Sequence, residues 1–276
     1  MLSFYAIDDY LTCPLKYKFA HLLRVPLAPH HSIIYGSALH AAVSEFHKRH
    51  ARGDVMTEDA LVEAFVAAWR NEGFLSREHE EARLAAGRAA LHRFREEQLA
   101  PGAVIPAYVE REFSFMLDGD RVRGRYDRVD ITPRAAGDDA PGADEDAPAE
   151  PASGADVVEP TLGLAPERVV ITDYKSSDVR DPAKARQRAK DSLQLSIYAM
   201  GYEAMTGRLP DAVALHFLES GLVGTVPVQR KRIEKARESV RTAAAGIRAR
   251  EFGARPGHMS CTYCAFREIC PSSVVR

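Results

Sequence analysis

The sequence has no long apolar run, no internal repeat and few cysteines, and each absence excludes a class of protein. No apolar stretch approaches the roughly 18 residues that a membrane-spanning helix needs. No repeat of solenoid length is visible. The first nine residues are acidic where a signal peptide would be basic, and they lack an apolar segment. With 46% hydrophobic and 28% charged residues, we expect one globular domain over residues 1–276, cytoplasmic and without a membrane partner.

Basic residues are missing from residues 135–160, which carry eight acidic ones: Asp138, Asp139, Asp144, Glu145, Asp146, Glu150, Asp156 and Glu159. Ala, Pro and Gly fill most of the rest, so the stretch has little to bury, and we interpret about 135–167 as a disordered acidic insertion. Subtracting its eight acids leaves 37 basic against 31 acidic residues elsewhere. This small positive excess is compatible with a polyanionic partner but does not identify nucleic acid.

Apolar residues recur at helical spacing through the first hundred residues, which predicts a helical block over about 1–100. One stripe contains Leu39, Val43 and Phe46, a second runs from Leu61 to Trp69, and a third helix follows Ser76.

The pattern changes to alternation at Tyr108, which predicts an α/β core over about 105–250. The expected elements are strands 108–117 and 121–131 joined at Asp118-Gly119-Asp120, strand 169–175, helix 182–205 closed by Gly207, strands 212–219 and 222–228, and a basic amphipathic helix 230–250. The predicted fold is α/β, a mixed central sheet flanked by helices.

Two carboxylates and a lysine lie where predicted strands end. Asp173 and Lys175 are two residues apart, so both side chains leave the same face of the strand, while the Tyr174 carbonyl stays near the edge. Pairing with the preceding hairpin brings Asp127 beside Asp173. Two carboxylates and a main-chain oxygen suit Mg²⁺ or Mn²⁺. Taken alone, however, these residues also describe an ordinary ion pair at a strand end.

Three further polar residues have two interpretations each. His40 lies near the start of a helix beside the apolar stripe, where it is either a packing residue or a metal ligand. Gln194 and Tyr198 are four apart on one helical face, which is either a solvated face or part of a site.

The four cysteines are Cys13 and a late C-x-x-C-x5-C group, Cys261, Cys264 and Cys270. In a cytosolic protein such spacing favours metal binding over disulfides. Four thiolates suit a zinc ion or an iron–sulfur cluster, and the spacing does not separate the two. Either group would join the two ends of the chain.

Taken in order, these motifs resemble the RecB-type branch of the PD-(D/E)xK nucleases, in particular its iron–sulfur members such as AddB and the nuclease domains fused to UvrD-like helicases. The likeness runs from Tyr10 to Pro271 and omits only the acidic insertion. The matching motifs are Gly36-x-x-x-His40, Gly124-x-x-Asp127, Asp173-x-Lys175, Gln194-x-x-x-Tyr198 and the cysteine pattern. Tyr126 departs from the proline in the superfamily's name.

The resemblance implies a restriction-endonuclease-like fold and a Mg²⁺- or Mn²⁺-dependent deoxyribonuclease. His40, Asp127, Asp173 and the Tyr174 carbonyl would bind the metal, with Asp127, Asp173 and Lys175 catalytic. Gln194 and Tyr198 would position DNA and the lysine, and Cys13, Cys261, Cys264 and Cys270 would hold a [4Fe–4S] cluster rather than zinc. The activity expected is an exonuclease with a preference for single-stranded DNA, in repair or recombination. Because no G-x-x-x-x-G-K-[ST] motif occurs, a UvrD- or AddA-like helicase must be a partner or a removed fusion portion.

Three other functions were compared with this one. A catalytically silent DNA-binding module of a helicase complex is disfavoured by the intact Asp127, Asp173 and Lys175. A nuclease of CRISPR spacer acquisition would use the same motifs and stays open. Zinc-dependent base deamination needs His-x-Glu and Pro-Cys-x-x-Cys, but Ser260 precedes Cys261 and no His-x-Glu occurs.

Overall fold

The computed structural model describes residues 1–134 and 167–275, and most of the predicted acidic insertion lies outside these ranges; Glu167 is the first residue of a strand. The N-terminal elements are α1 (Phe4–Thr12), α2 (Pro14–Tyr17), the π-helical turn η1 (Lys18–Leu22), α3 (His31–His50), α4 (Glu58–Ala67) and α5 (Arg77–Leu99). The remainder comprises β1 (Tyr108–Leu117), β2 (Asp120–Pro133), β3 (Glu167–Lys175), α6 (Pro182–Lys190), α7 (Leu193–Thr206), β4 (Ala212–Phe217), β5 (Leu222–Pro227), α8 (Arg230–Arg248) and α9 (His258–Thr262).

A five-stranded sheet in the order β1-β2-β3-β4-β5 forms the centre of the described chain. The pair β3–β4 is parallel and the other three neighbouring pairs are antiparallel. The α6–α7 segment supplies the crossover that a parallel pair requires. The predicted mixed α/β sheet with flanking helices, of the restriction-endonuclease-like type, is therefore confirmed.

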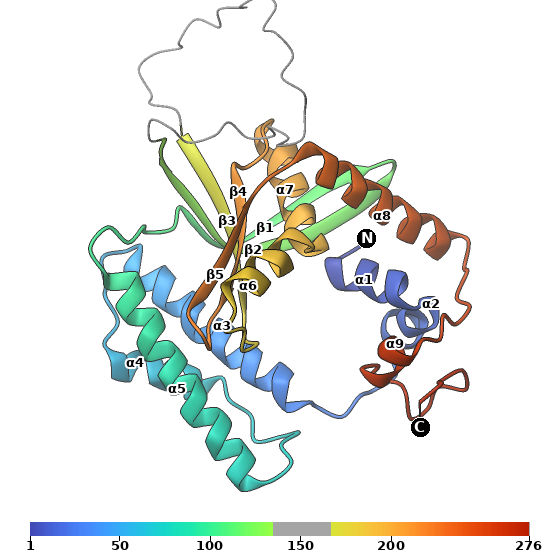
Figure 1. The fold of residues 1–276 in the computed structure, drawn as a ribbon, viewed down its shortest axis with the longest axis horizontal. Coiled ribbons are helices and arrows are strands. Elements are labelled where there is room, and N and C mark those ends of the chain that lie inside the picture. The colour runs from blue at the N-terminus through green and yellow to red at the C-terminus, as the bar shows by residue number, and fades with distance from the viewer. Residues whose placement is uncertain (135–166, 276) are drawn as a thin grey trace, which may run out of the picture.

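The two faces of the sheet are covered by different helices (Figure 1). Residues of α1, α6, α7 and α8 share one buried apolar cluster with all five strands. Residues of α3, α4 and α5 form a second cluster, to which β3 contributes Tyr174 from its opposite face. Because side chains alternate along a strand, β3 presents Asp173 and Lys175 toward α7 and Tyr174 toward α3 and α5.

Two predicted boundaries are wrong. The expected helix 182–205 is two helices, because Ser192 caps the start of α7 by accepting a hydrogen bond from the Leu195 N–H at 3.2 Å. The expected three-residue turn is a two-residue turn at Asp118-Gly119, whose φ angles of 49° and 88° match the twist of a tight hairpin, so β2 begins at Asp120.

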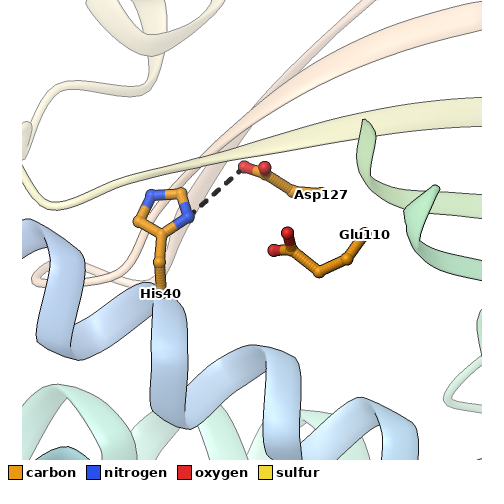
Figure 2. A group of neighbouring side chains, drawn as sticks. All are labelled: His40, Glu110 and Asp127. Carbon is orange, nitrogen blue, oxygen red and sulfur yellow. Dashed lines mark ion pairs between the residues drawn. The ribbon is translucent and has the colours of Figure 1, made fainter. Parts of the chain in front are cut away.

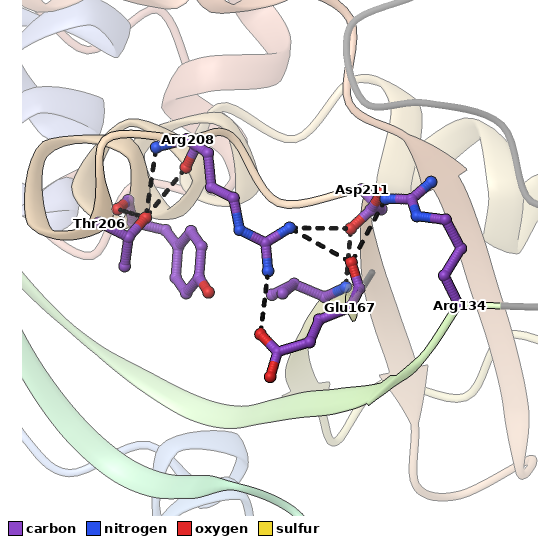
Figure 3. A network of polar contacts seen from close by, with 7 residues as sticks. Arg134, Glu167, Thr206, Arg208 and Asp211 are labelled. Carbon is purple, nitrogen blue, oxygen red and sulfur yellow. Dashed lines mark hydrogen bonds and ion pairs between the residues drawn. The ribbon is translucent and has the colours of Figure 1, made fainter. Parts of the chain in front are cut away.

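A polar network fastens the end of the β2–β3 pair beside the undescribed segment (Figure 3). Buried Asp211, just before β4, accepts hydrogen bonds from the Val169 N–H at 2.7 Å and from the Arg134 guanidinium. Arg208 forms ion pairs with Glu167 at 3.4 Å and with Asp211 at 3.9 Å. The network joins β2, β3 and β4 at the sheet end opposite to Lys175.

Among the helices of the described residues, none combines the length and the apolar character needed to cross a bilayer.

Candidate active site

Three acidic residues occupy one row across the first three strands. The β1–β2 register pairs Val109 with Arg128 and Arg111 with Tyr126, which places Glu110 opposite Asp127. The β2–β3 register pairs Arg128 with Thr172 and so continues the row to Asp173. Glu110 has a left-handed φ of 53°, and the ladder is interrupted there. Such strained non-glycine residues cluster at functional sites.

His40, Glu110 and Asp127 form a group with the geometry of a metal site. Their ligand atoms lie within 4.8 Å of one another, the only such set of three found in residues 1–134 and 167–275. Figure 2 shows the histidine, which comes from α3, and both carboxylates directed toward one another. His40 Nδ1 lies 3.6 Å from Asp127 Oδ2. One imidazole and two carboxylates are suitable ligands for a divalent cation.

The electrostatics of this group favour a cation. Burial, followed by the charge of Asp173, raises the pKa of Asp127 to about 8, although the Tyr174 N–H donates to its Oδ2 at 2.9 Å. Burial lowers the pKa of His40, against the opposing influence of Asp173 and Glu110, so the imidazole is neutral and has a lone pair to offer. Glu110 pairs with Arg125 at 2.6 Å and Asp127 is largely protonated at neutral pH, so a cation bound here would take the place of a proton on Asp127.

A closed circuit of polar contacts adjoins this group on the α7 side. Lys175 Nζ lies 2.7 Å from Asp173 Oδ2 and donates to Gln194 Oε1 at 2.8 Å. Gln194 Nε2 donates to the Tyr198 hydroxyl at 2.9 Å, and this hydroxyl donates to Asp173 Oδ1 at 3.3 Å. Burial alone would lower the pKa of Lys175, but the Asp173 carboxylate outweighs it and the pKa is raised. Lys175 is therefore held as a cation, one-third exposed, beside the acidic row.

The glycines of two motifs permit close packing around the site. A Cβ on Gly124 would lie 2.4 Å from Cζ of Phe113, whose ring stacks on Tyr126 at a centroid distance of 4.5 Å. A Cβ on Gly36 would lie 3.1 Å from the Ser176 Oγ, just after β3. These glycines let the hairpin and α3 approach the sheet residues that carry the acidic row.

The residues predicted for the site fall into two adjoining sets. His40 and Asp127 lie in the three-ligand group, and the Tyr174 backbone binds Asp127, whereas Asp173, Lys175, Gln194 and Tyr198 form the polar circuit. Sequence reasoning missed Glu110. The turn after Leu117 could have revealed it. A two-residue turn fixes which residues of the two strands pair, and this register places Glu110 opposite Asp127.

The four cysteines line one pocket, although they come from both ends of the chain. Cys13 lies between α1 and α2, and Cys261, Cys264 and Cys270 lie in or after α9, which Figure 1 shows beside α2. All four are free and half-buried. Among the described residues, their sulfurs do not form a set of three within 4.8 Å of one another.

Exposed positive charge lies on both α6 and α8. On α8, Arg237 pairs with Glu203 at 2.8 Å and Arg241 with Asp118 at 2.5 Å, while the exposed Lys231 and Lys235 form no ion pair within the described part of the chain. On α6, the exposed Lys184, Arg186 and Lys190 likewise have no acidic partner there. This helix follows β3 directly, after the loop 176–181. Its charge therefore lies on the element that leaves the site.

Comparison with known proteins supports one family. No curated protein matches the chain. Among solved structures, a crystal structure of SSO0001 is 13% identical in sequence and covers 95% of each chain, but at a TM-score of 0.36 the likeness is too distant to carry an argument. The family model described as the PD-(D/E)XK nuclease superfamily matches residues 1–139 and 155–271, which include the acidic row, the polar circuit and all four cysteines. Matched over both segments, the chain belongs to the PD-(D/E)XK nuclease superfamily.

Proposed function

We propose that this protein is a Mg²⁺- or Mn²⁺-dependent deoxyribonuclease that hydrolyses phosphodiester bonds. The observation that carries the proposal is the group of His40, Glu110 and Asp127 within 4.8 Å, next to the cationic Lys175. A silent DNA-binding module would have no need for a carboxylate whose pKa is raised to about 8 or for a buried lysine circuit.

The residues present fit a divalent cation. His40, Asp127 and the Tyr174 carbonyl would hold it, as the family resemblance implies, and Glu110 adds a carboxylate within reach. Asp173, with 2% of its side chain exposed, would add a ligand oxygen while its carboxylate stays paired with Lys175. Binding of positive charge would relieve the repulsion that raises the pKa of Asp127.

The roles of the chain's own residues follow from this arrangement. The cation would lower the pKa of water and offset charge on the phosphate. Lys175, kept protonated by Asp173 and aimed by Gln194 Oε1, would orient the attacking water and compensate negative charge as the phosphodiester is cleaved. Tyr198 holds Gln194 and Asp173 in place through its hydroxyl. A raised pKa makes Lys175 an electrostatic group rather than a base at neutral pH.

DNA would approach along α6. Its exposed Arg186 and Lys190, four residues apart on one side of the helix, would provide phosphate contacts beyond Lys175. Replacing Arg186 and Lys190 by glutamate should weaken DNA binding and reduce its salt dependence without changing Mn²⁺ binding. An unchanged salt dependence would place the DNA on another surface.

The finer assignments rest on the family resemblance. We propose exonuclease activity with a preference for single strands, in DNA repair or recombination, and in the cytoplasm. A UvrD- or AddA-like helicase would supply the motor that this sequence lacks. For the cysteine pocket we propose a [4Fe–4S] cluster with a structural role, as the family resemblance implies and as four thiols lining one pocket allow.

The decisive experiment is digestion of end-labelled single- and double-stranded DNA with Mg²⁺, Mn²⁺ or EDTA. We expect cleavage with either metal, none with EDTA, and none by Asp127→Asn with either metal. A circular single-stranded substrate separates exonuclease from endonuclease action. DNA binding without cleavage under all conditions would favour the silent module and refute the proposal.

A further inference from the structure

A buried polar network lies behind the site, on the face of β3 that turns toward α3 and α5. Its centre is the Tyr174 side chain, which is 2% exposed. The Tyr174 hydroxyl lies 2.7 Å from His47 Nε2 and accepts a hydrogen bond from Arg128 Nη1 at 3.4 Å. Burial lowers the pKa of His47 to about 3, so the neutral imidazole accepts the hydroxyl proton. None of these three side chains faces the phosphate side of the site.

The network leaves Tyr174 little freedom. Arg128 is fixed by two contacts to Asp130 at 2.7 and 2.9 Å, by Gln98 Oε1 at 2.5 Å and by the Val104 carbonyl at 2.8 Å. The Tyr174 ring stacks on His47 at a centroid distance of 5.9 Å. Each guanidinium nitrogen of Arg128 is therefore hydrogen-bonded. The Tyr174 hydroxyl is held from two elements, by Arg128 of β2 and by His47 of α3.

The Tyr174 backbone in turn contacts the site directly. Its N–H donates to Asp127 Oδ2 at 2.9 Å, and its carbonyl is an expected metal ligand under the proposed function. A side chain that cannot rotate or shift therefore fixes the peptide units on both sides of its own Cα.

The same hydrogen bond also places the histidine ligand. His40 and His47 are seven residues apart on α3, which is two helical turns, so they lie on one face about 10.5 Å apart along the axis. Anchoring His47 to Tyr174 sets the position of α3 along β3. His40 is thereby held 3.6 Å from Asp127.

We propose that His47, Arg128 and the Tyr174 hydroxyl are positioning residues that set the affinity of the site for a divalent cation, by fixing both α3 and the Tyr174 backbone. The inference rests on the proposed function, because it needs a cation at His40 and Asp127. A purely apolar packing of β3 against α3 would not specify this register, whereas the directional hydrogen bonds of the Tyr174 hydroxyl with His47 and Arg128 do, with His47 Nδ1 left unpartnered within the described residues.

The test measures Mn²⁺ affinity by electron paramagnetic resonance on full-length protein, without DNA. We expect Tyr174→Phe and His47→Leu each to raise the Mn²⁺ dissociation constant at least about 10-fold, the effect typical of residues that orient metal ligands. The double variant should lose no more Mn²⁺ affinity than either single variant, because both substitutions remove the same hydrogen bond, between the Tyr174 hydroxyl and His47. His47→Gln keeps an acceptor for the hydroxyl and should restore most of the affinity. The maximal rate at saturating Mn²⁺ should largely recover, since every ligand remains.

Leu61→Ala is the matched control, because it removes packing from the same apolar cluster as Tyr174 without deleting any contact of the hydroxyl. It should lower the melting temperature and leave Mn²⁺ affinity unchanged. Wild-type affinity in Tyr174→Phe and His47→Leu, or fully additive losses in the double variant, would overturn the inference. Asp127→Asn distinguishes failure of this inference from failure of the proposed function. If that variant also binds Mn²⁺ like the wild type, the proposed metal site itself is refuted.

Discussion

Replacing Asp127 by asparagine is expected to stabilise the metal-free protein at neutral pH while abolishing its metal-dependent activity. The carboxylate is 13% exposed, and burial beside Asp173 raises its pKa from 3.8 to about 8. Between these values the folded state binds more protons than the unfolded state, so stability falls as pH rises. At 1.36 kcal/mol per unit, the penalty at pH 7 is at most about 4 kcal/mol. Asparagine removes the charge and still accepts the Tyr174 N–H.

The assay is thermal and urea denaturation of both proteins in EDTA, from pH 4 to pH 8. The melting temperature of Asp127→Asn should exceed that of the wild type by up to about 10 °C at pH 7 and by almost nothing at pH 4. Mn²⁺ should narrow this difference and close it at about 1,000 times the dissociation constant, because only the wild type gains binding energy, about 2.7 kcal/mol at 100 times that constant and about 4.1 kcal/mol at 1,000 times.

Asp173→Asn is the matched control, for which we expect the stability of the folded protein to fall rather than rise. It leaves the Lys175 ammonium without its carboxylate at 2.7 Å, so we expect a loss of about 2–3 kcal/mol at pH 7 and pH 8. If Asp127→Asn is as unstable as Asp173→Asn in EDTA at pH 8, the electrostatic reasoning about the acidic row is wrong.

Three further predictions concern the lysine, the cysteines and a motif glycine. Lys175→Ala should lower the maximal rate of cleavage at least about 100-fold with Mn²⁺ affinity little changed, measured by steady-state kinetics and metal titration. Cys264→Ser should lose iron, visible absorption and thermal stability together in anaerobically purified protein, whereas a colourless, fully active wild-type protein with bound zinc would contradict the cluster. Gly124→Ala should cost about 1–3 kcal/mol in urea denaturation, because its Cβ would meet the Phe113 ring at 2.4 Å. Gly253→Ala, where a Cβ has open space, should be nearly neutral.

Local spacing was enough to predict some contacts around the site. Asp173 and Lys175 share a strand face because alternate residues do, and their charged atoms lie 2.7 Å apart. Gln194 and Tyr198 meet because residues four apart on a helix are neighbours, and their side chains are bonded at 2.9 Å. The mixed sheet followed in the same way from the change of period along the chain.

Contacts between distant segments could not be predicted in this way. His47 lies in an apolar stripe, and its local sequence indicates a packing residue. Its hydrogen-bond partner Tyr174 is 127 positions away, so local spacing does not predict their contact. Glu110 enters the site through a left-handed φ that propensity assigns to glycine or asparagine. The break at Ser192 was missed because the apolar pattern continues through it, although serine is a common helix cap.

The cysteine pocket has a consequence for biosynthesis. Cys13 leaves the ribosome early, whereas Cys270 leaves it only after the whole sheet has been made. A site that all four thiolates share is therefore complete only after the segments of β1 to β5 have been synthesised. A shortage of the group bound there would leave the acidic row and the polar circuit in place and α1 untethered at Cys13. The segments around α1 and α9 would then be open to proteolysis before the sheet is lost.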